Sequence, residues 1–200
     1  MKFRFVLGIW ALLYTACQQK TTAQLTIATA ANMQFAMEAL VHAFSEQYSM
    51  DCEVILSSSG KLTAQIQQGA PFDVFVSADM KYPNELYQNG FTLAPPKIYA
   101  YGQLVLWSLE KQVPLSVDLL HQTKFKHLAM ANPRTAPYGR AAMEVLRYLK
   151  LEEQVEPQLV YGESIAQTNQ FIVTQSADLG FTAKSVVLSP NIKGQGTWIE

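Results

Sequence analysis

Residues 25–37, LTIATAANMQFAM, decide the fold class of this chain. The first four are apolar or β-branched, which predicts a buried strand. Asn32 is a favourable residue for the start of a helix, and apolar side chains recur at helical spacing behind it, from Met33 to Tyr48. We therefore predict a strand that passes through a short polar turn into a helix.

A turn of this kind favours an anion. The first backbone N–H groups of a helix have no partner within it, and the helix dipole adds partial positive charge at the same end. One such turn is weak evidence, because every α/β protein has several. Its meaning depends on whether other turns of the same kind face the same ligand.

The pattern of strand, polar turn and helix recurs along the chain. Further strands are expected at 52–56, 73–77, 98–107, 128–131, 159–161 and 178–183. Helices are expected at 33–49, 80–89, 139–150 and 165–175, with one that ends at Gly69 and a short one near 116–120. Strands that alternate with helices predict parallel sheets. The helix starts at Asn32, Ser59, Tyr138 and Ser164 fall two in each half, which predicts two α/β domains facing each other across a cleft.

Composition narrows the classes of function. The chain has 200 residues, of which 49% are hydrophobic and 16% charged, so it can bury a sizeable core in one domain or two small ones. Its net charge of −1 gives no support to a nucleic-acid surface. The three histidines share no spacing with cysteines or carboxylates that would suggest a metal site.

Residues 1–23 are expected to be an export signal. Two basic residues precede the apolar run 5–14, which is too short to span a membrane comfortably. Small residues then precede Cys17, which resembles a bacterial lipoprotein signal in which Cys17 is lipidated. The alternative is ordinary secretory cleavage after Ala23. Either way, we expect the protein in the periplasm or at the cell surface.

Several segments together resemble the molybdate-binding proteins, which are the extracytoplasmic substrate-binding subunits of ABC transporters for molybdate and tungstate. The segments are ATAAN (28–32), SSSGKL with QIQQGAPFDVFVSAD (57–62 and 65–79), NPRTAPYGRAAMEVL (132–146), and GESIAQT with ADLGF (162–168 and 177–181). The resemblance covers essentially all of residues 24–200.

The resemblance implies an α/β fold of the type II periplasmic-binding-protein class, with two Rossmann-like α/β domains joined by a hinge of crossing strands. Domain I is expected over 24–100, with 185–200 returning to it, and domain II over 101–184. Family members usually continue with a last strand and helices that return to the first domain. Since this chain stops at Glu200, we expect a truncated sequence and a partly exposed apolar face.

The resemblance also implies the binding site. Ile165 would donate only through its backbone, and Asn32 would turn its side-chain NH₂ to the ligand. A tyrosine that completes the site in some members falls at Ala183, where its hydroxyl is absent. The molybdenum or tungsten would be held through its oxygens, with no direct metal ligand. The expected oxyanion contacts are Asn32, Ser59, Tyr138 and Ile165, with a backbone N–H from Ala31.

We interpret the chain as a monomeric receptor that captures molybdate or tungstate in the interdomain cleft and delivers it to a membrane permease. No catalytic residue, cofactor or nucleic-acid partner is expected. Neutral donors suffice for a tetrahedral dianion, whereas a carboxylate in the cleft would count against this interpretation. The alternative is a binding protein of the same fold for another oxyanion, such as sulfate or phosphate.

Two other classes are less well supported. Ser59 could imitate a nucleophile, but there is no G-x-S-x-G motif and no histidine has an evident partner role. A transcriptional effector domain of this fold would need a helix-turn-helix, and an export signal stands in its place. Lys61, Arg134 and Arg140 stand next to the predicted helix starts; they could steer anions, but we interpret them as solvated surface charges. Asp73 and Asp79 flank a predicted strand, and we interpret them as cap and turn residues in preference to an acid pair.

Overall fold

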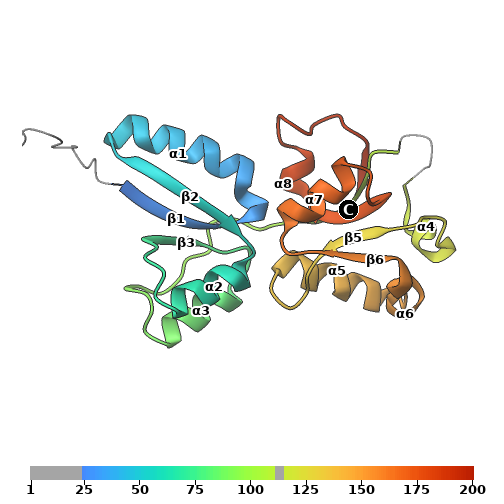
Figure 1. The fold of residues 1–200 in the computed structure, drawn as a ribbon, viewed down its shortest axis with the longest axis horizontal. Coiled ribbons are helices and arrows are strands. Elements are labelled where there is room, and N and C mark those ends of the chain that lie inside the picture. Colours follow the sequence, from blue (N-terminus) through green and yellow to red (C-terminus); the bar gives the residue numbers. More distant parts are fainter. Residues whose placement is uncertain (1–23, 111–114) are drawn as a thin grey trace, which may run out of the picture.

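The computed structural model describes residues 24–110 and 115–200, so the leader predicted for 1–23 and lipidation at Cys17 lie outside the described residues. Two lobes lie side by side along the long axis of the molecule (Figure 1). One is built on a three-stranded sheet and the other on a five-stranded sheet. Within the described ranges, no helix has the length and apolar character needed to cross a membrane.

The first lobe follows from the opening stretch. Its three parallel strands lie in the order β2-β1-β3, with β1 in the centre. The second half of β1 is buried, because strands flank it and helices cover both faces of the sheet (Figure 1). A single 3-10 turn, η2, leads from β1 into the first helix. The elements are β1 (Gln24–Ala30), η2 (Ala31–Met33), α1 (Gln34–Tyr48), β2 (Asp51–Ser57), α2 (Ser59–Gln67), β3 (Val74–Val76) and α3 (Lys81–Gln88).

The second lobe carries the larger core. Its strands lie in the order β6-β5-β7-β4-β8; β5 is parallel to β6 and β7, and β4 is antiparallel to β7 and β8. Helices α5 and α6 cover one face and α7 and α8 the other (Figure 1). The elements are β4 (Leu104–Ser108), α4 (Val117–Gln122), β5 (Leu128–Ala131), α5 (Pro137–Tyr148), α6 (Glu152–Val155), η3 (Glu156–Gln158), β6 (Leu159–Gly162), α7 (Ile165–Val173), β7 (Leu179–Ala183), α8 (Lys184–Val187) and β8 (Thr197–Ile199).

The α/β class and the alternation of strands and helices are confirmed, with two local differences. The long strand expected over 98–107 is a strand only from Leu104, and residues 95–103 have no regular structure. Residues 185–200 were expected to return to the first domain. Instead, β8 pairs with β4 in the second sheet, and the buried indole of Trp107 donates to the carbonyl of Gln195 at 3.0 Å. A strand of three residues is too short for its sequence pattern to predict which strand it pairs with.

The lobes touch at the carboxyl ends of their parallel strands. The N–H of Gly60 donates to the carbonyl of Thr135 at 2.9 Å, and the hydroxyl of Ser185 donates to the carbonyl of Asn32 at 2.9 Å. A Cβ atom at Gly60 would lie 2.6 Å from the Tyr82 hydroxyl and 2.7 Å from the Thr135 carbonyl oxygen. The closest approach of the two lobes therefore requires glycine.

We predict that Gly60→Ala prevents the lobes from closing fully while each lobe stays folded. The Tyr82 side chain would have to swing away from the added methyl, giving up its contacts with the second lobe, and the Thr135 backbone can retreat only if the lobes separate. Because alanine favours a helix more than glycine does, the unfolding free energy should change by less than about 1 kcal/mol. Small-angle scattering should report a larger radius of gyration than for the wild type or for Gln65→Ala, an exposed change on the same helix. An unchanged radius would contradict the close contact.

Candidate functional site

Four helix starts, two from each lobe, meet where the lobes touch. Ala31 and Asn32 open η2, Ser59 opens α2, Tyr138 is the second residue of α5 and Ile165 opens α7. All five are buried, and all five line one small cavity. The structure therefore brings together every residue that the sequence placed in the site; that they contact an oxyanion remains a proposal.

The cavity is lined by neutral groups. None of its described lining residues is Asp, Glu, His, Lys or Arg. The space open to the centre of a water-sized sphere is about 10 Å³, which is room for about one water molecule, so a tetrahedral oxyanion would fit only if the surrounding groups moved apart to admit it. Helix starts supply partial positive charge and unpartnered N–H groups without a charged side chain. The arrangement favours a small anion and offers no carboxylate to repel it.

Ser59 is placed to donate a hydrogen bond into the cavity. Its Oγ accepts the N–H of Ala78 at 3.0 Å, which leaves the hydroxyl proton for another acceptor. The alternative role of a plain helix cap belongs to its neighbour Ser58, the N-cap residue of α2. Asn32 likewise lies inside η2, and the N-cap residue of α1 is Met33. Helix capping therefore explains neither Ser59 nor Asn32.

Ser58 is a further candidate for the site that the sequence interpretation missed. It lines the cavity and is 3% exposed, and its Oγ has no hydrogen-bond partner. As the N-cap of α2 it makes no side-chain cap bond. A buried hydroxyl without a partner is rare because it costs about 1–3 kcal/mol, so its presence here points to a ligand. The run of three serines at 57–59 was the available signal.

Asn32 and Tyr138 join the two lobes through their side chains. The Asn32 amide hydrogen-bonds to the Tyr138 hydroxyl, and its Oδ1 is buried without a partner. We expected the NH₂ group to face the ligand, and in this orientation the oxygen is the unpartnered atom. A half-turn of the amide exchanges the two atoms in place: Tyr138 then donates to Oδ1, and the NH₂ group becomes free for an anion.

Burial keeps the Tyr138 hydroxyl protonated. Its pKa is raised from 10.0 to about 12, mainly by desolvation and also by the charge of nearby Tyr99, while the hydrogen bond with Asn32 acts in the opposite direction. The phenol therefore remains a hydrogen-bond donor throughout the physiological pH range. An ionised phenolate here would repel an anion, so the raised pKa suits an oxyanion site.

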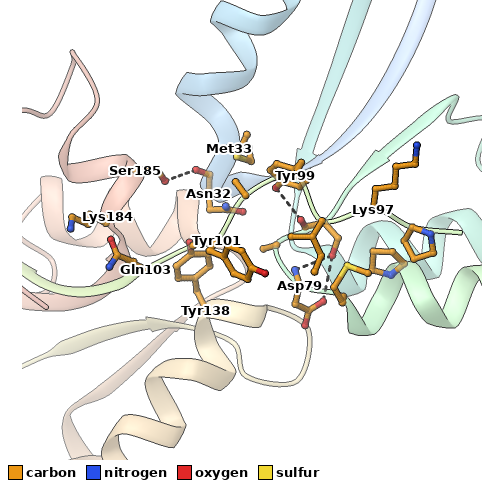
Figure 2. Close-up of a pocket in the computed structure, with 18 of the residues that line it drawn as sticks. Asn32, Met33, Asp79, Lys97, Tyr99, Tyr101, Gln103, Tyr138, Lys184 and Ser185 are labelled. Carbon is orange, nitrogen blue, oxygen red and sulfur yellow. Dashed lines mark hydrogen bonds between the residues drawn. The ribbon is translucent and has the colours of Figure 1, made fainter.

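A larger groove of about 410 Å³ lies beside the cavity (Figure 2). Asn32, Ala78 and Tyr138 line both spaces. The groove contains the Asp79 carboxylate and is bordered by the irregular segment 95–103, with the aromatic rings of Tyr99 and Tyr101 beside it. Lys97 and Lys184 also line the groove and the Asp79 carboxylate is paired with Arg140, so charge does not exclude an anion there. The cavity differs from the groove in that the starts of η2, α2, α5 and α7 all line it.

Charged residues beside the cavity pair across the lobes. Lys61 pairs with Glu163, and Arg140 pairs with Asp79. Lys61 is exposed, as expected for a solvated surface charge, although it has a partner, whereas the interpretation of Arg140 as a solvated charge was wrong because its side chain is only 26% exposed. Asp79 keeps the expected turn contacts with Ser77 and adds the pair with Arg140. Each partner was unrecognisable in the sequence because it belongs to the other lobe.

Arg134, Asp73 and Ala183 have surface or structural roles. Arg134 is exposed. The carboxylate of Asp73 accepts the backbone N–H of Thr26 at 2.8 Å, as a turn residue does. Ala183 is fully buried in an apolar cluster that also contains Tyr138 and Ile165. Among the described residues there is no cluster of His, Cys, Asp and Glu that could hold a metal ion.

The raised pKa of Tyr138 predicts a loss of stability in alkali. Its protonated form favours the folded state fully below pH 10, and this contribution is lost as the pH rises from 10 to about 12. Chemical denaturation should show that the unfolding free energy of the wild type falls more steeply over this window than that of Tyr138→Phe, which cannot ionise. Parallel curves would show that Tyr138 titrates as an exposed phenol does.

The geometry agrees with comparisons to known proteins. A family model described as bacterial extracellular solute-binding protein matches residues 25–200. The chain is 41% identical over 189 residues to a molybdate-binding protein of Azotobacter vinelandii, a match that covers 92% of this chain and 73% of that protein. It is 38% identical over 176 residues to a molybdate-binding protein of Rhodobacter capsulatus, covering 86% of this chain and 68% of that one.

A solved structure extends the likeness to three dimensions. The periplasmic molybdate-binding protein of Azotobacter vinelandii superposes on this chain with a TM-score of 0.83 at 34% identity, covering 87% of this chain and 77% of that one. A family model that spans nearly all described residues and relatives above 30% identity agree with each other. This chain therefore belongs to the family of bacterial extracellular solute-binding proteins, as a relative of molybdate-binding proteins.

Proposed function

We propose that this protein captures molybdate or tungstate in the cavity between its lobes and delivers it to the permease of an ABC transporter. The observation that carries the proposal is the neutral cavity at four helix starts, in which buried polar atoms of Asn32 and Ser58 lack partners. Relatives that bear the name molybdate-binding protein support the identity of the anion.

Neutral donors can hold a dianion because several weak contributions add. Each helix start contributes roughly 0.3–1 kcal/mol, and more where it is partly buried. Each charge-assisted hydrogen bond contributes roughly 1.5–3 kcal/mol. Side-chain donors come from Ser59, Tyr138 and the amide of Asn32, while Ala31 and Ile165 offer backbone N–H groups. The metal atom of the anion is reached only through its oxygens, and the ligand is cargo, not a cofactor.

The proposal includes an exported, monomeric protein without enzymatic activity. The Ser59 Oγ accepts the Ala78 N–H, and no histidine lines the described cavity, so Ser59 has no general base there. Export follows from the leader at 1–23, with anchoring through Cys17 or cleavage after Ala23. The two domains are taken as 24–100 and 101–184, with 185–200 attached to the second by the pairing of β8.

Titration calorimetry with molybdate, tungstate, sulfate and phosphate tests the ligand class. We expect tight binding of molybdate and tungstate and at least tenfold weaker binding of sulfate and phosphate, equivalent to about 1.4 kcal/mol. Sulfate is also a tetrahedral dianion, so the size of the closed cavity must separate it from molybdate. Tight binding of sulfate without binding of molybdate would refute the proposal in favour of the alternative oxyanion.

The variant Ser59→Ala should weaken molybdate binding by about 1–3 kcal/mol, because it removes one donor to the anion. Ser189→Ala is the matched control: its hydroxyl is also buried and also hydrogen-bonded, to the carbonyl of Val186 at 2.7 Å, but it lies outside the cavity. Calorimetry should show the loss in Ser59→Ala alone. An equal affinity in both variants would remove the Ser59 hydroxyl from the site.

A further inference from the structure

We propose that Arg140, with Asp79 and Tyr82, forms a latch across the cleft that holds the lobes closed and slows release of the bound anion. The latch does not line the anion cavity, so Arg140 is a positioning residue. The inference rests on the proposed function for its ligand, but it also predicts the behaviour of the ligand-free protein.

The latch joins the two lobes through one guanidinium group. Arg140 lies on α5 of the second lobe, and its Nη2 pairs with the Asp79 carboxylate of the first lobe. Its Nη1 donates to the Tyr82 hydroxyl at 3.0 Å, and its Cζ lies 5.1 Å from the centre of the Tyr82 ring. The Tyr82 hydroxyl in turn donates to the carbonyl of Arg134 at 3.4 Å. The Arg140 guanidinium and the Asp79 carboxylate therefore neutralise each other. The hydrogen-bond acceptors come from both lobes: Asp79 and Tyr82 from the first, and the Arg134 carbonyl from the second.

The latch is linked to the cavity through its neighbours in the chain. Asp79 follows Ala78, whose N–H holds the Oγ of Ser59 at 3.0 Å. Arg140 follows Tyr138 by two residues, on the same first turn of α5. The movement that brings Tyr138 against Asn32 therefore also brings Arg140 against Asp79. Closure of the cavity and closure of the latch are one event.

Partial burial distinguishes this pair from an ordinary surface ion pair. The side chains of Arg140 and Asp79 are each 26% exposed, and Tyr82 is buried. The second cross-lobe pair, Lys61 with Glu163, is 44% and 57% exposed, so water and salt screen it more strongly. The planar guanidinium group of arginine can donate to a carboxylate and to a phenol at the same time. The ammonium group of lysine lacks this geometry.

The latch acts on the population of the closed state. Anion contacts from both lobes exist only when the lobes are closed, so the apparent affinity scales with the closed fraction. Opening leaves the Asp79 carboxylate without its cationic partner, next to the site of a dianion. Loss of the latch should therefore raise the rate of dissociation more than it lowers the rate of association.

The test compares Arg140→Gln with Arg147→Gln. Arg147 is on the same helix and also pairs with a carboxylate, Glu152, at 2.8 and 3.0 Å, but this pair lies within one lobe. Stopped-flow displacement of molybdate should give a dissociation rate about tenfold faster in Arg140→Gln, the order expected when a partly buried charge pair loses one partner. Arg147→Gln should match the wild type, and Arg140→Lys should recover only part of the loss.

A double-variant cycle and scattering complete the test. Asp79→Asn should also speed dissociation, but less than Arg140→Gln does, because Arg140 keeps its hydrogen bond to Tyr82, and the double variant should be no worse than Arg140→Gln. Small-angle scattering without ligand should show a larger radius of gyration in Arg140→Gln than in Arg147→Gln. This second readout needs no molybdate, so it separates failure of the latch from failure of the proposed function.

Two outcomes would overturn the latch. One is an unchanged dissociation rate in Arg140→Gln, with an unchanged radius of gyration. The other is a loss of affinity that lies wholly in the association rate, which would make Arg140 a steering charge for the anion. If the wild type fails to bind molybdate but the radius of gyration still rises in Arg140→Gln, the latch stands and the ligand assignment falls.

Discussion

The structure depends on backbone N–H groups that no helix can satisfy within itself. A helix leaves its first N–H groups without partners, and four helices here begin at one point between two lobes. The lobes cannot bring these starts together in an apolar environment without something to accept their hydrogen bonds. An anion with several oxygens meets this need, and water meets it less completely. The two-lobed architecture follows from this constraint, because only facing sheets aim their strand ends at a common centre.

The neutral groups that line the cavity and the charged side chains around it play different roles. Hydroxyls, an amide and backbone groups line the cavity, so an anion bound there would be held by oriented dipoles. Charged side chains lie one step further out and pair across the cleft. Under the proposed function the dipoles would recognise the anion, and the ion pairs would set how long the lobes remain closed. The carboxylates of Asp79 and Glu163 would oppose an anion if they were free, and each has a cation from the other lobe.

The sequence predicted the parts of the fold that rest on local chemistry. Residue propensities and turn residues predicted the alternating strands and helices and the helix starts at Ser59 and Ile165. The resemblance to molybdate-binding proteins implied that these helix starts face one ligand. Contacts between distant residues were out of reach. The pairing of β8 with β4, the ion pair of Arg140 with Asp79 and the missing partner of Ser58 depend on how segments far apart in the chain come together. No periodicity encodes such contacts.

The central claim is that the small neutral cavity, and not the larger groove beside it, holds the oxyanion. A crystal structure of the protein with tungstate tests it directly, because tungsten scatters anomalously and is located without ambiguity. The account predicts one strong anomalous peak between the lobes, with anion oxygens within hydrogen-bond distance of Ser59 Oγ, the Asn32 amide and the Ile165 N–H. A peak in the groove beside Tyr99 and Tyr101, or none between the lobes, would contradict it.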